Sequence, residues 1–421
     1  MQCEIASNFY HDEDMAEAEA ILRSCVHCGF CTATCPTYQI VGDELDGPRG
    51  RIYLIKEFLA GAPTSSESLT HLDRCLLCRA CETTCPSGVR YARLVEIGRR
   101  NLEPHLGRPA RERLQRALLR SIIPYPQRLR PLLQIARRVK EVLREDWARQ
   151  IPDCPTPTAA TELEGSEQPR VLLLAGCVQS VSTPATNLAL QKILDYLQTP
   201  WRVPVTAGCC GALSQHLSAE EEALGFMRRN IDAWWPRIEQ GAQAILVSAS
   251  GCGAMVKEYG QALQHDPAYA EKARRVAELA RDPGEWLLEG GFEFPSIVPA
   301  QRKVAFHSPC SLQHAQRLSG KIETLLQHVG YDLVPVADAH LCCGSAGSYS
   351  LLQPELAREL RERKLSCLEA KAPDCIATAN VGCQLHLQQE ADVPVRHWLE
   401  LLADALPETL GAGERQSSAQ A

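Results

Sequence analysis

Two runs of four cysteines near the N-terminus constrain the fold of this 421-residue chain more than any other feature. Each run reads C-x2-C-x2-C-x3-C-P, and together they comprise Cys25, Cys28, Cys31, Cys35, Cys75, Cys78, Cys81 and Cys85. Three thiolates spaced by two residues can wrap one face of an iron–sulfur cube within a single tight loop, and bacterial two-cluster ferredoxins use this run. The sequence therefore predicts an N-terminal, α-helical, ferredoxin-like domain with two 4Fe–4S clusters.

The fourth cysteine of each run points away from its own cluster in this type of fold and ligates the other cluster. We therefore predict two crosswise ligand sets. Cluster one would take Cys25, Cys28, Cys31 and Cys85, and cluster two would take Cys75, Cys78, Cys81 and Cys35. Four thiolates also suit zinc, but zinc ribbons pair C-x2-C units across a longer gap, so we favour iron–sulfur clusters.

The 39 residues between the two runs are an insertion relative to a minimal ferredoxin. We expect a turn over residues 46–51 and a helix over residues 52–59, because a Gly-Pro pair precedes the apolar stretch. Arg49, Arg51 and Lys56 would either offset the negative charge of a cluster or lie on a solvated helix face.

The chain has 20 cysteines, although its other composition is ordinary for a soluble protein of several domains: 45% hydrophobic, 23% charged and a net charge of −7. Its acidic N-terminus has no apolar core of a signal peptide. No run reaches the ~18 apolar residues of a membrane span. We therefore expect a cytoplasmic protein whose reduced thiols are metal ligands or redox groups. The 5% aromatic content and the negative charge argue against a nucleic-acid partner.

A second repeat occupies the C-terminal part of the chain. Strand-like segments at 171–176 and 304–309 each lead to a cysteine, a Cys-Cys-Gly sequence and a fourth cysteine after another strand-like segment. The equivalent cysteines are Cys177 and Cys310, Cys209 and Cys342, Cys210 and Cys343, and Cys252 and Cys383. Offsets of 133 and 131 residues indicate an internal duplication. Alternating strands and helices predict two homologous α/β cysteine-rich modules with parallel sheets and cysteines at the strand ends.

The eight cysteines of these modules have two interpretations. They are either ligands of an additional iron–sulfur or zinc site, or small buried side chains that pack well. An adjacent Cys-Cys pair repeated at one spacing favours the metal or redox role. His216, His307 and His314 would be ligands, proton carriers or structural histidines, and we favour the structural role for each. Cys3, Cys154, Cys367 and Cys375 have no partner spacing and are expected to be incidental.

Residues 108–150 form a basic segment with a charge of +8, which leaves −15 for the rest of the chain. Apolar residues recur there at helical spacing, and Pro124 and Pro126 divide the segment into two helices. These apolar residues are Leu114, Leu118, Ile122, Leu132, Ile135, Val139 and Leu143. A basic amphipathic helix pair suits an anionic membrane surface or an acidic partner protein. The alternative is a solvated arm packed on the ferredoxin part.

These features predict a division of the chain into five parts. They are a two-cluster domain at 1–107, a basic arm and flexible linker at 108–168, a first module at 169–295, a second module at 296–406 and a disordered tail at 407–421.

The cysteine runs, the DGPRGRIYLIK segment between them and the later HLCCGSAGSYS and TANVGCQLHL segments resemble the iron–sulfur subunits of bacterial glycolate oxidase. The resemblance spans about Arg23 to Leu402. It implies a subunit that works beside two flavoprotein subunits, which carry the flavin and oxidise glycolate, or D-lactate, to the 2-oxo acid. Electrons would then pass through this chain to a quinone or another membrane acceptor, with the chain at the cytoplasmic face of the inner membrane. The resemblance also implies that the eight cysteines of the two runs carry the 4Fe–4S clusters and that this chain has no catalytic residue of its own.

Related subunits serve lactate utilisation, anaerobic glycerol-3-phosphate oxidation and heterodisulfide reduction. The heterodisulfide-reductase module ends in C-x2-C, whereas the first position of that pair is Ala249 in one half of this chain and Asn380 in the other. A thiol–disulfide enzyme is therefore the alternative function, and the missing thiols count against it. A scaffold that only docks the flavoproteins is a third interpretation of the modules.

Overall fold

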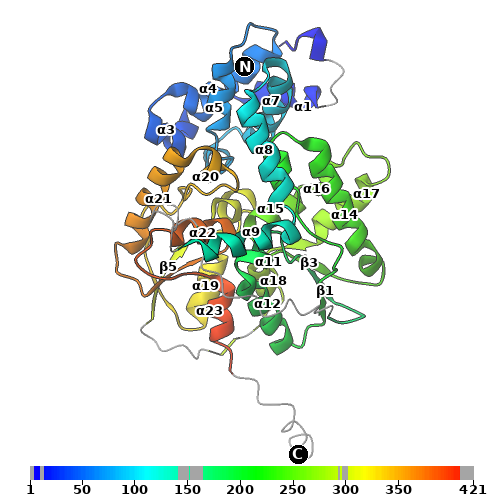
Figure 1. The fold of residues 1–421 in the computed structure, drawn as a ribbon, viewed down its shortest axis with the longest axis vertical. Coiled ribbons are helices and arrows are strands. Elements are labelled where there is room, and N and C mark those ends of the chain that lie inside the picture. Colours follow the sequence, from blue (N-terminus) through cyan, green and yellow to red (C-terminus); the bar gives the residue numbers. More distant parts are fainter. Residues whose placement is uncertain are drawn as a thin grey trace, which may run out of the picture.

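The computed structural model describes residues 4–9, 14–140, 151, 165–292, 294–295 and 302–407. The helical domain at the N-terminus lies over two α/β modules, and the arm that follows it runs down their front (Figure 1). No helix among these residues has the length and apolar character needed to cross a membrane.

The N-terminal domain is built from short helices separated by the cysteine loops. Its elements are η1 (Ser7–Phe9), α1 (Met15–Ser24), α2 (Phe30–Ala33), α3 (Pro36–Val41), η2 (Glu44–Asp46), α4 (Pro48–Leu59), α5 (Ser66–Asp73), α6 (Ala80–Thr84) and α7 (Tyr91–Leu106). Its core is formed by α1, α4, α5 and α7, where Leu22, Ile55 and Leu94 are fully buried. The expected helix at 52–59 is confirmed, but the expected turn at 46–51 is wrong from Pro48 onward, because α4 already begins there. Pro48 occupies the first position of α4, where its missing N–H costs nothing.

The arm consists of α8 (Ala110–Ile122) and α9 (Pro126–Arg138), so the division at Pro124 and Pro126 is confirmed. Part of its positive charge binds the arm to the rest of the protein, because Arg108 and Arg116 both contact Asp73 of the N-terminal domain, at 2.6 and 2.9 Å. Arg120 contacts Glu222 of the first module at 2.8 Å. The predicted apolar stripe faces outward: Leu114 is 62% exposed and Ile135 is 57% exposed. Leu143 and most of the predicted linker lie outside the described residues.

The first module is a four-stranded parallel sheet in the order β2-β1-β3-β4, flanked by helices. Its elements are β1 (Val171–Leu173), α11 (Gln179–Ser182), α12 (Pro184–Tyr196), β2 (Trp201–Arg202), α13 (Ala212–His216), α14 (Glu220–Glu239), β3 (Ala244–Leu246), α15 (Ser250–Lys257), α16 (Tyr259–Ala262), α17 (Ala270–Leu279), β4 (Ala280–Arg281) and α18 (Pro283–Glu289). Strands β1 and β3 are buried throughout, as expected for parallel strands covered on both faces.

The second module repeats this topology with the order β6-β5-β7-β8, which confirms the predicted duplication and the parallel sheets. Its elements are β5 (Lys303–His307), the π-helical turn η4 (Ser311–Ala315), α19 (Lys321–His328), β6 (Asp332–Val334), α20 (Tyr349–Leu352), α21 (Pro354–Glu369), β7 (Cys375–Thr378), α22 (Val381–Gln388), β8 (Val395–His397) and α23 (Trp398–Asp404). The predicted tail beyond 407 lies outside the described residues.

The two modules share one hydrophobic core rather than standing apart. Apolar residues from one face of each sheet form a single cluster, in which Ile193 of α12 and Trp398 of α23 are fully buried. The strand ends also meet, because Ser250 N donates to Ala379 O at 3.0 Å and the Ser250 and Ser311 hydroxyls lie 2.8 Å apart. The cysteine-bearing edges of the two sheets therefore lie close to each other and beneath the N-terminal domain (Figure 1).

Candidate metal centres

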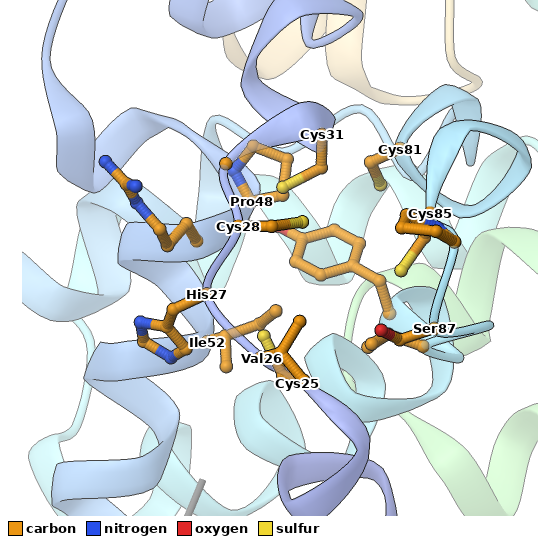
Figure 2. Close-up of a pocket in the computed structure, with 15 residues that line it drawn as sticks. Cys25, Val26, His27, Cys28, Cys31, Pro48, Ile52, Cys81, Cys85 and Ser87 are labelled. Carbon is orange, nitrogen blue, oxygen red and sulfur yellow. The ribbon is translucent and has the colours of Figure 1, made fainter.

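The first run and the end of the second run meet around one pocket. Cys25, Cys28, Cys31 and Cys85 line it, together with Cys81, Arg49 and Tyr91. Figure 2 shows Cys28 and Cys31 on one side of this pocket, Cys85 on the opposite side and Cys25 at its lower edge. The chain enters this pocket from α1, turns through the loop before α2 and returns at the end of α6. The four side chains assigned to cluster one therefore come together.

A second pocket adjoins the first. Cys35, Cys75, Cys78 and Cys81 line it, with Arg51 and Tyr91 on its wall. Cys81 borders both pockets. The exchange of fourth cysteines between the runs is thus reproduced in space, since Cys35 lies with the second run and Cys85 with the first.

The two cysteine loops share an unusual backbone conformation. His27 and Gly29 in the first loop have positive φ angles of 55° and 84°, and Leu77 and Arg79 at the matching places have 52° and 63°. Left-handed residues that alternate in a short loop turn successive backbone N–H groups toward one centre, which is how many iron–sulfur sites bind an anionic cluster. Only Gly29 takes this conformation without strain, so the other three positions mark a functional constraint that residue type does not reveal.

Three of the thiols in these pockets, those of Cys31, Cys78 and Cys81, hold their protons more tightly than a free cysteine does. Burial and the neighbouring Cys25 thiol raise the pKa of Cys31 to about 11. Burial and nearby thiols also raise the pKa values of Cys78 and Cys81 well above the usual range. A bound cation deprotonates a coordinating thiol outright. Two adjoining pockets, lined between them by the eight thiols of the two runs, fit 4Fe–4S clusters in donor chemistry.

A buried cation lies beside the second pocket. Arg51 is 1% exposed, and its guanidinium lies 3.2 Å from Thr37 Oγ1, which lies 3.3 Å from Cys35 Sγ. Burial lowers the pKa of Arg51, but Tyr91, Cys75 and Cys35 raise it more, so the net pKa is above its usual value. Tyr91 also donates its hydroxyl hydrogen to Cys75 Sγ at 3.6 Å. These groups favour added negative charge in the second pocket.

Asp46 holds this cation in place. The fully buried carboxylate contacts Arg51 at 3.4 Å, Arg74 at 2.8 Å and His71 at 3.2 Å. The nearby group of Asp43, Asp46 and His71 is therefore an ion-pair network rather than a metal site. Of Arg49, Arg51 and Lys56, Arg51 lines the second pocket, Arg49 lines the first pocket and Lys56 contacts Glu57 at 3.0 Å.

The two pockets differ in their surroundings. Cys28 is exposed, and the neighbouring Val26 and Phe30 are 66% and 61% exposed. Cys78, in contrast, packs against Cys310 and Cys342 in a cluster that joins the N-terminal domain to the second module. Tyr349 reinforces this junction by donating to Arg74 O at 3.1 Å.

The four repeat thiols of the first module form a connected row. The thiols of Cys177 and Cys210 donate toward Cys209, which lowers the pKa of Cys209 well below its usual value and raises theirs. Cys210 in turn contacts Cys252. The strand ends therefore bring the four predicted residues together, at the sheet edge where open α/β folds place their sites.

The second module forms the equivalent row of thiols. Cys310 Sγ lies 3.8 Å from Cys342 Sγ, Cys342 contacts Cys343 and Cys343 contacts Cys383. His307 adds an imidazole beside Cys343 and Cys383. Burial, together with Lys364 and His386 nearby, holds the pKa of His307 well below its usual value.

The other candidate residues have structural surroundings. His314 bonds Thr83 Oγ1 and His340 O, both at 2.9 Å, and so joins the second module to the N-terminal domain. Burial, Arg99 and Arg79 lower the pKa of His216 to about 4, and it lies among arginines rather than thiols. Cys375 is fully buried in β7, and Cys367 lies on α21 outside both rows. Cys3 and Cys154 lie outside the described residues.

Known proteins resemble this chain along nearly all of its length. Residues 21–89 match the family described as the 4Fe-4S dicluster domain, and residues 171–257 and 304–388 each match the cysteine-rich domain family. The glycolate oxidase iron-sulfur subunit of Escherichia coli is 50% identical over 96% of this chain and 99% of its own. The probable glycolate oxidase iron-sulfur subunit of Bacillus subtilis is 30% identical over 89% of this chain and 90% of its own.

A more distant relative covers part of the chain. Lactate utilization protein A of Bacillus licheniformis is 24% identical over 55% of this chain and 98% of its own. The two cysteine runs, the paired cysteine-rich modules and the full-length likeness at 50% identity agree with one another. This chain therefore belongs to the family of glycolate oxidase iron–sulfur subunits, which are iron–sulfur electron-transfer subunits of an oxidoreductase complex.

Proposed function

We propose that this chain relays electrons from two flavoprotein subunits, which oxidise glycolate and also D-lactate, to a quinone. The flavin belongs to the partner subunits, and this chain forms no bond with the substrate. The observation that supports the proposal most strongly is the crosswise gathering of eight cysteines into two adjoining pockets.

The relay balances the chemistry at its two ends. Oxidation of glycolate to glyoxylate releases two electrons and two protons, and reduction of a quinone to a quinol consumes the same number. A 4Fe–4S cluster, when bound, takes up and releases one electron at a time. A two-electron flavin donor is therefore matched to a quinone acceptor by two single-electron transfers.

The residues around the pockets suit this role. The exposed Cys28, with Val26 and Phe30 beside it, gives a separate redox protein close access to cluster one. Arg51 and Tyr91 favour the extra negative charge of a reduced cluster two. The contact of Cys78 with Cys310 and Cys342 offers electrons a buried route toward the second module.

The arm supports a location at the cytoplasmic face of a membrane. Leu114 and Leu118 on α8 and Leu132 and Ile135 on α9 are between 46% and 62% exposed. Exposed arginines, including Arg111, Arg113, Arg128 and Arg138, lie on the same two helices. Apolar side chains flanked by basic ones suit the interface of an anionic bilayer, where a quinone would be reached.

Reconstitution with the flavoprotein subunits tests the relay. Cys28→Ser and Cys78→Ser should abolish glycolate-to-quinone turnover, whereas a dye that takes electrons directly from the flavin should still be reduced. Cys367→Ser removes a thiol outside both pockets and should behave as wild type. Full quinone turnover in either pocket variant would contradict the proposal. Reduction of a disulfide by the purified chain without flavoproteins would favour the thiol–disulfide enzyme instead.

A further inference from the structure

One buried histidine of the second module has no visible structural reason for its position. His307 ends β5, is 2% exposed, and neither of its ring nitrogens has a hydrogen-bond partner in the described part of the chain. A buried polar group without a partner typically costs about 1–3 kcal/mol, so such groups are rare unless something binds them. The buried His386 of the same module, by comparison, lies 3.2 Å from Ala357 O.

The histidine faces two thiols. One ligating atom each from His307, Cys343 and Cys383 lie within 4.8 Å of one another, and all three residues are buried. Around a tetrahedral zinc, bond lengths of about 2.3 Å to sulfur and 2.0 Å to nitrogen place neighbouring ligand atoms about 3.5–3.8 Å apart. The three atoms therefore need only a small adjustment to become ligands of one metal atom.

The topology of the sheet produces this arrangement. β5 and β7 pair in parallel, with His307 opposite Thr378 at their carboxyl ends. Cys383 lies in the first turn of α22, directly after β7, and Cys343 follows β6 on the other side of β5. The three residues thus converge between the central strands, where the strand order changes direction and open α/β sheets bind their ligands.

The first module lacks the same set of donors. The 133-residue offset makes Leu174 the equivalent of His307 in the first module. Leu174 is buried in an apolar cluster that includes Cys210 and Val247. Among the described residues, no three donors of the first module's thiol row come within the same mutual distance. The two modules therefore differ at the position where the second module has the imidazole of His307 as a possible nitrogen ligand.

Asn380 positions one of the two thiols. It occupies the position where heterodisulfide-type modules have a further thiol. Its side chain instead donates to Cys383 Sγ at 3.6 Å and accepts from Gly251 N at 3.4 Å. It therefore orients Cys383 and joins the two modules, and the third donor to the site comes from His307.

We propose that His307, Cys343 and Cys383 ligate a metal centre, containing zinc or iron, in the second module only. This centre is additional to the two clusters of the relay and can be tested without turnover. Imidazole and thiolate together suit both metals. Cys343 contacts Cys342, and Cys342 shares a buried cluster with Cys78 of the second pocket. The proposed centre is therefore connected to the second pocket through Cys342.

Metal and sulfide analysis of the full chain, purified without oxygen, tests the proposal. Wild type should contain about one equivalent of zinc, or iron beyond that of the two 4Fe–4S clusters. His307→Leu, which copies Leu174, should lose that metal and keep the paramagnetic resonance signals of the two clusters. His386→Leu removes another buried histidine of this module and should keep the metal. Loss of zinc alone, of iron alone, or of iron with sulfide would identify the centre as zinc, an iron ion or a third cluster.

A second variant distinguishes loss of a ligand from misfolding of the module. His307→Cys supplies a thiolate and should retain the metal, while X-ray absorption at the metal edge loses the scattering of the imidazole ring. Wild-type protein without extra metal would overturn the proposal. Unchanged metal content in His307→Leu, or an unchanged absorption spectrum in His307→Cys, would do the same.

Discussion

Removal of the Arg51 charge should lower the reduction potential of cluster two. The guanidinium contacts Thr37 Oγ1 at 3.2 Å and that oxygen contacts Cys35 Sγ at 3.3 Å, so charge and sulfur lie at most 6.5 Å apart. At an effective dielectric constant of about 20, one charge at that distance contributes about 2.5 kcal/mol, or about 110 mV for one electron. Water and salt screen this charge little, because Arg51 is 1% exposed. We therefore expect Arg51→Met to lower the potential by about 100 mV.

A potentiometric titration followed by electron paramagnetic resonance measures this shift. Arg51→Lys keeps the charge and should move the potential by less than half as much. Cluster one, whose pocket is not lined by Arg51, serves as the internal reference. Asp46 keeps Arg74 and His71 as partners, so its carboxylate is not left unpaired in the variant. Equal potentials of cluster two in wild type and Arg51→Met would refute the electrostatic reasoning.

Three further outcomes are expected. Tyr91→Phe removes the hydroxyl that donates to Cys75 Sγ, and it should lower the potential of cluster two by tens of millivolts in the same titration, because hydrogen bonds to sulfur raise cluster potentials. Burial raises the pKa of Asp282 to about 7, so the folded protein binds a proton at this carboxyl more tightly than the unfolded chain does. The stability gained from that proton is complete below about pH 4 and is lost as the pH rises to about 7. Asp282→Asn should keep the cap on Gly284 N and remove this pH dependence of the free energy of unfolding, which is on the order of 4 kcal/mol at most; thermal unfolding between pH 4 and 7 measures it, and an unchanged slope would contradict this explanation. Leu118→Glu and Ile135→Glu together should weaken flotation with phosphatidylglycerol vesicles, as should raised salt, whereas binding insensitive to both would favour a merely structural arm.

Cysteine spacing predicted much of the site because metal ligation is local in sequence. The C-x2-C-x2-C-x3-C-P runs predicted which residues meet in each pocket, including the exchange of Cys35 and Cys85. The 133-residue repeat predicted two parallel sheets with cysteines at their ends. Residue patterns carry this information because neighbours in the chain supply most of the donors.

Contacts between distant segments could not be predicted in this way. The apolar stripe of the arm indicated helices but not their orientation, and the structure turns Leu114 outward because Arg116 and Arg120 bind the carboxylates beneath. The shared core of the two modules and the contact of Cys78 with Cys342 likewise depend on how whole domains pack. No sequence pattern distinguishes His307 from an ordinary core histidine, because its unpartnered nitrogens and its place beside Cys343 depend on how distant segments pack.

Rapid-freeze electron paramagnetic resonance of the complete complex tests the relay most directly. After one addition of glycolate without an acceptor, the signals of both reduced clusters should appear, and a quinone should then reoxidise them at least as fast as steady-state turnover. Clusters that stay oxidised while quinone is reduced at the full rate would contradict the role proposed for this chain.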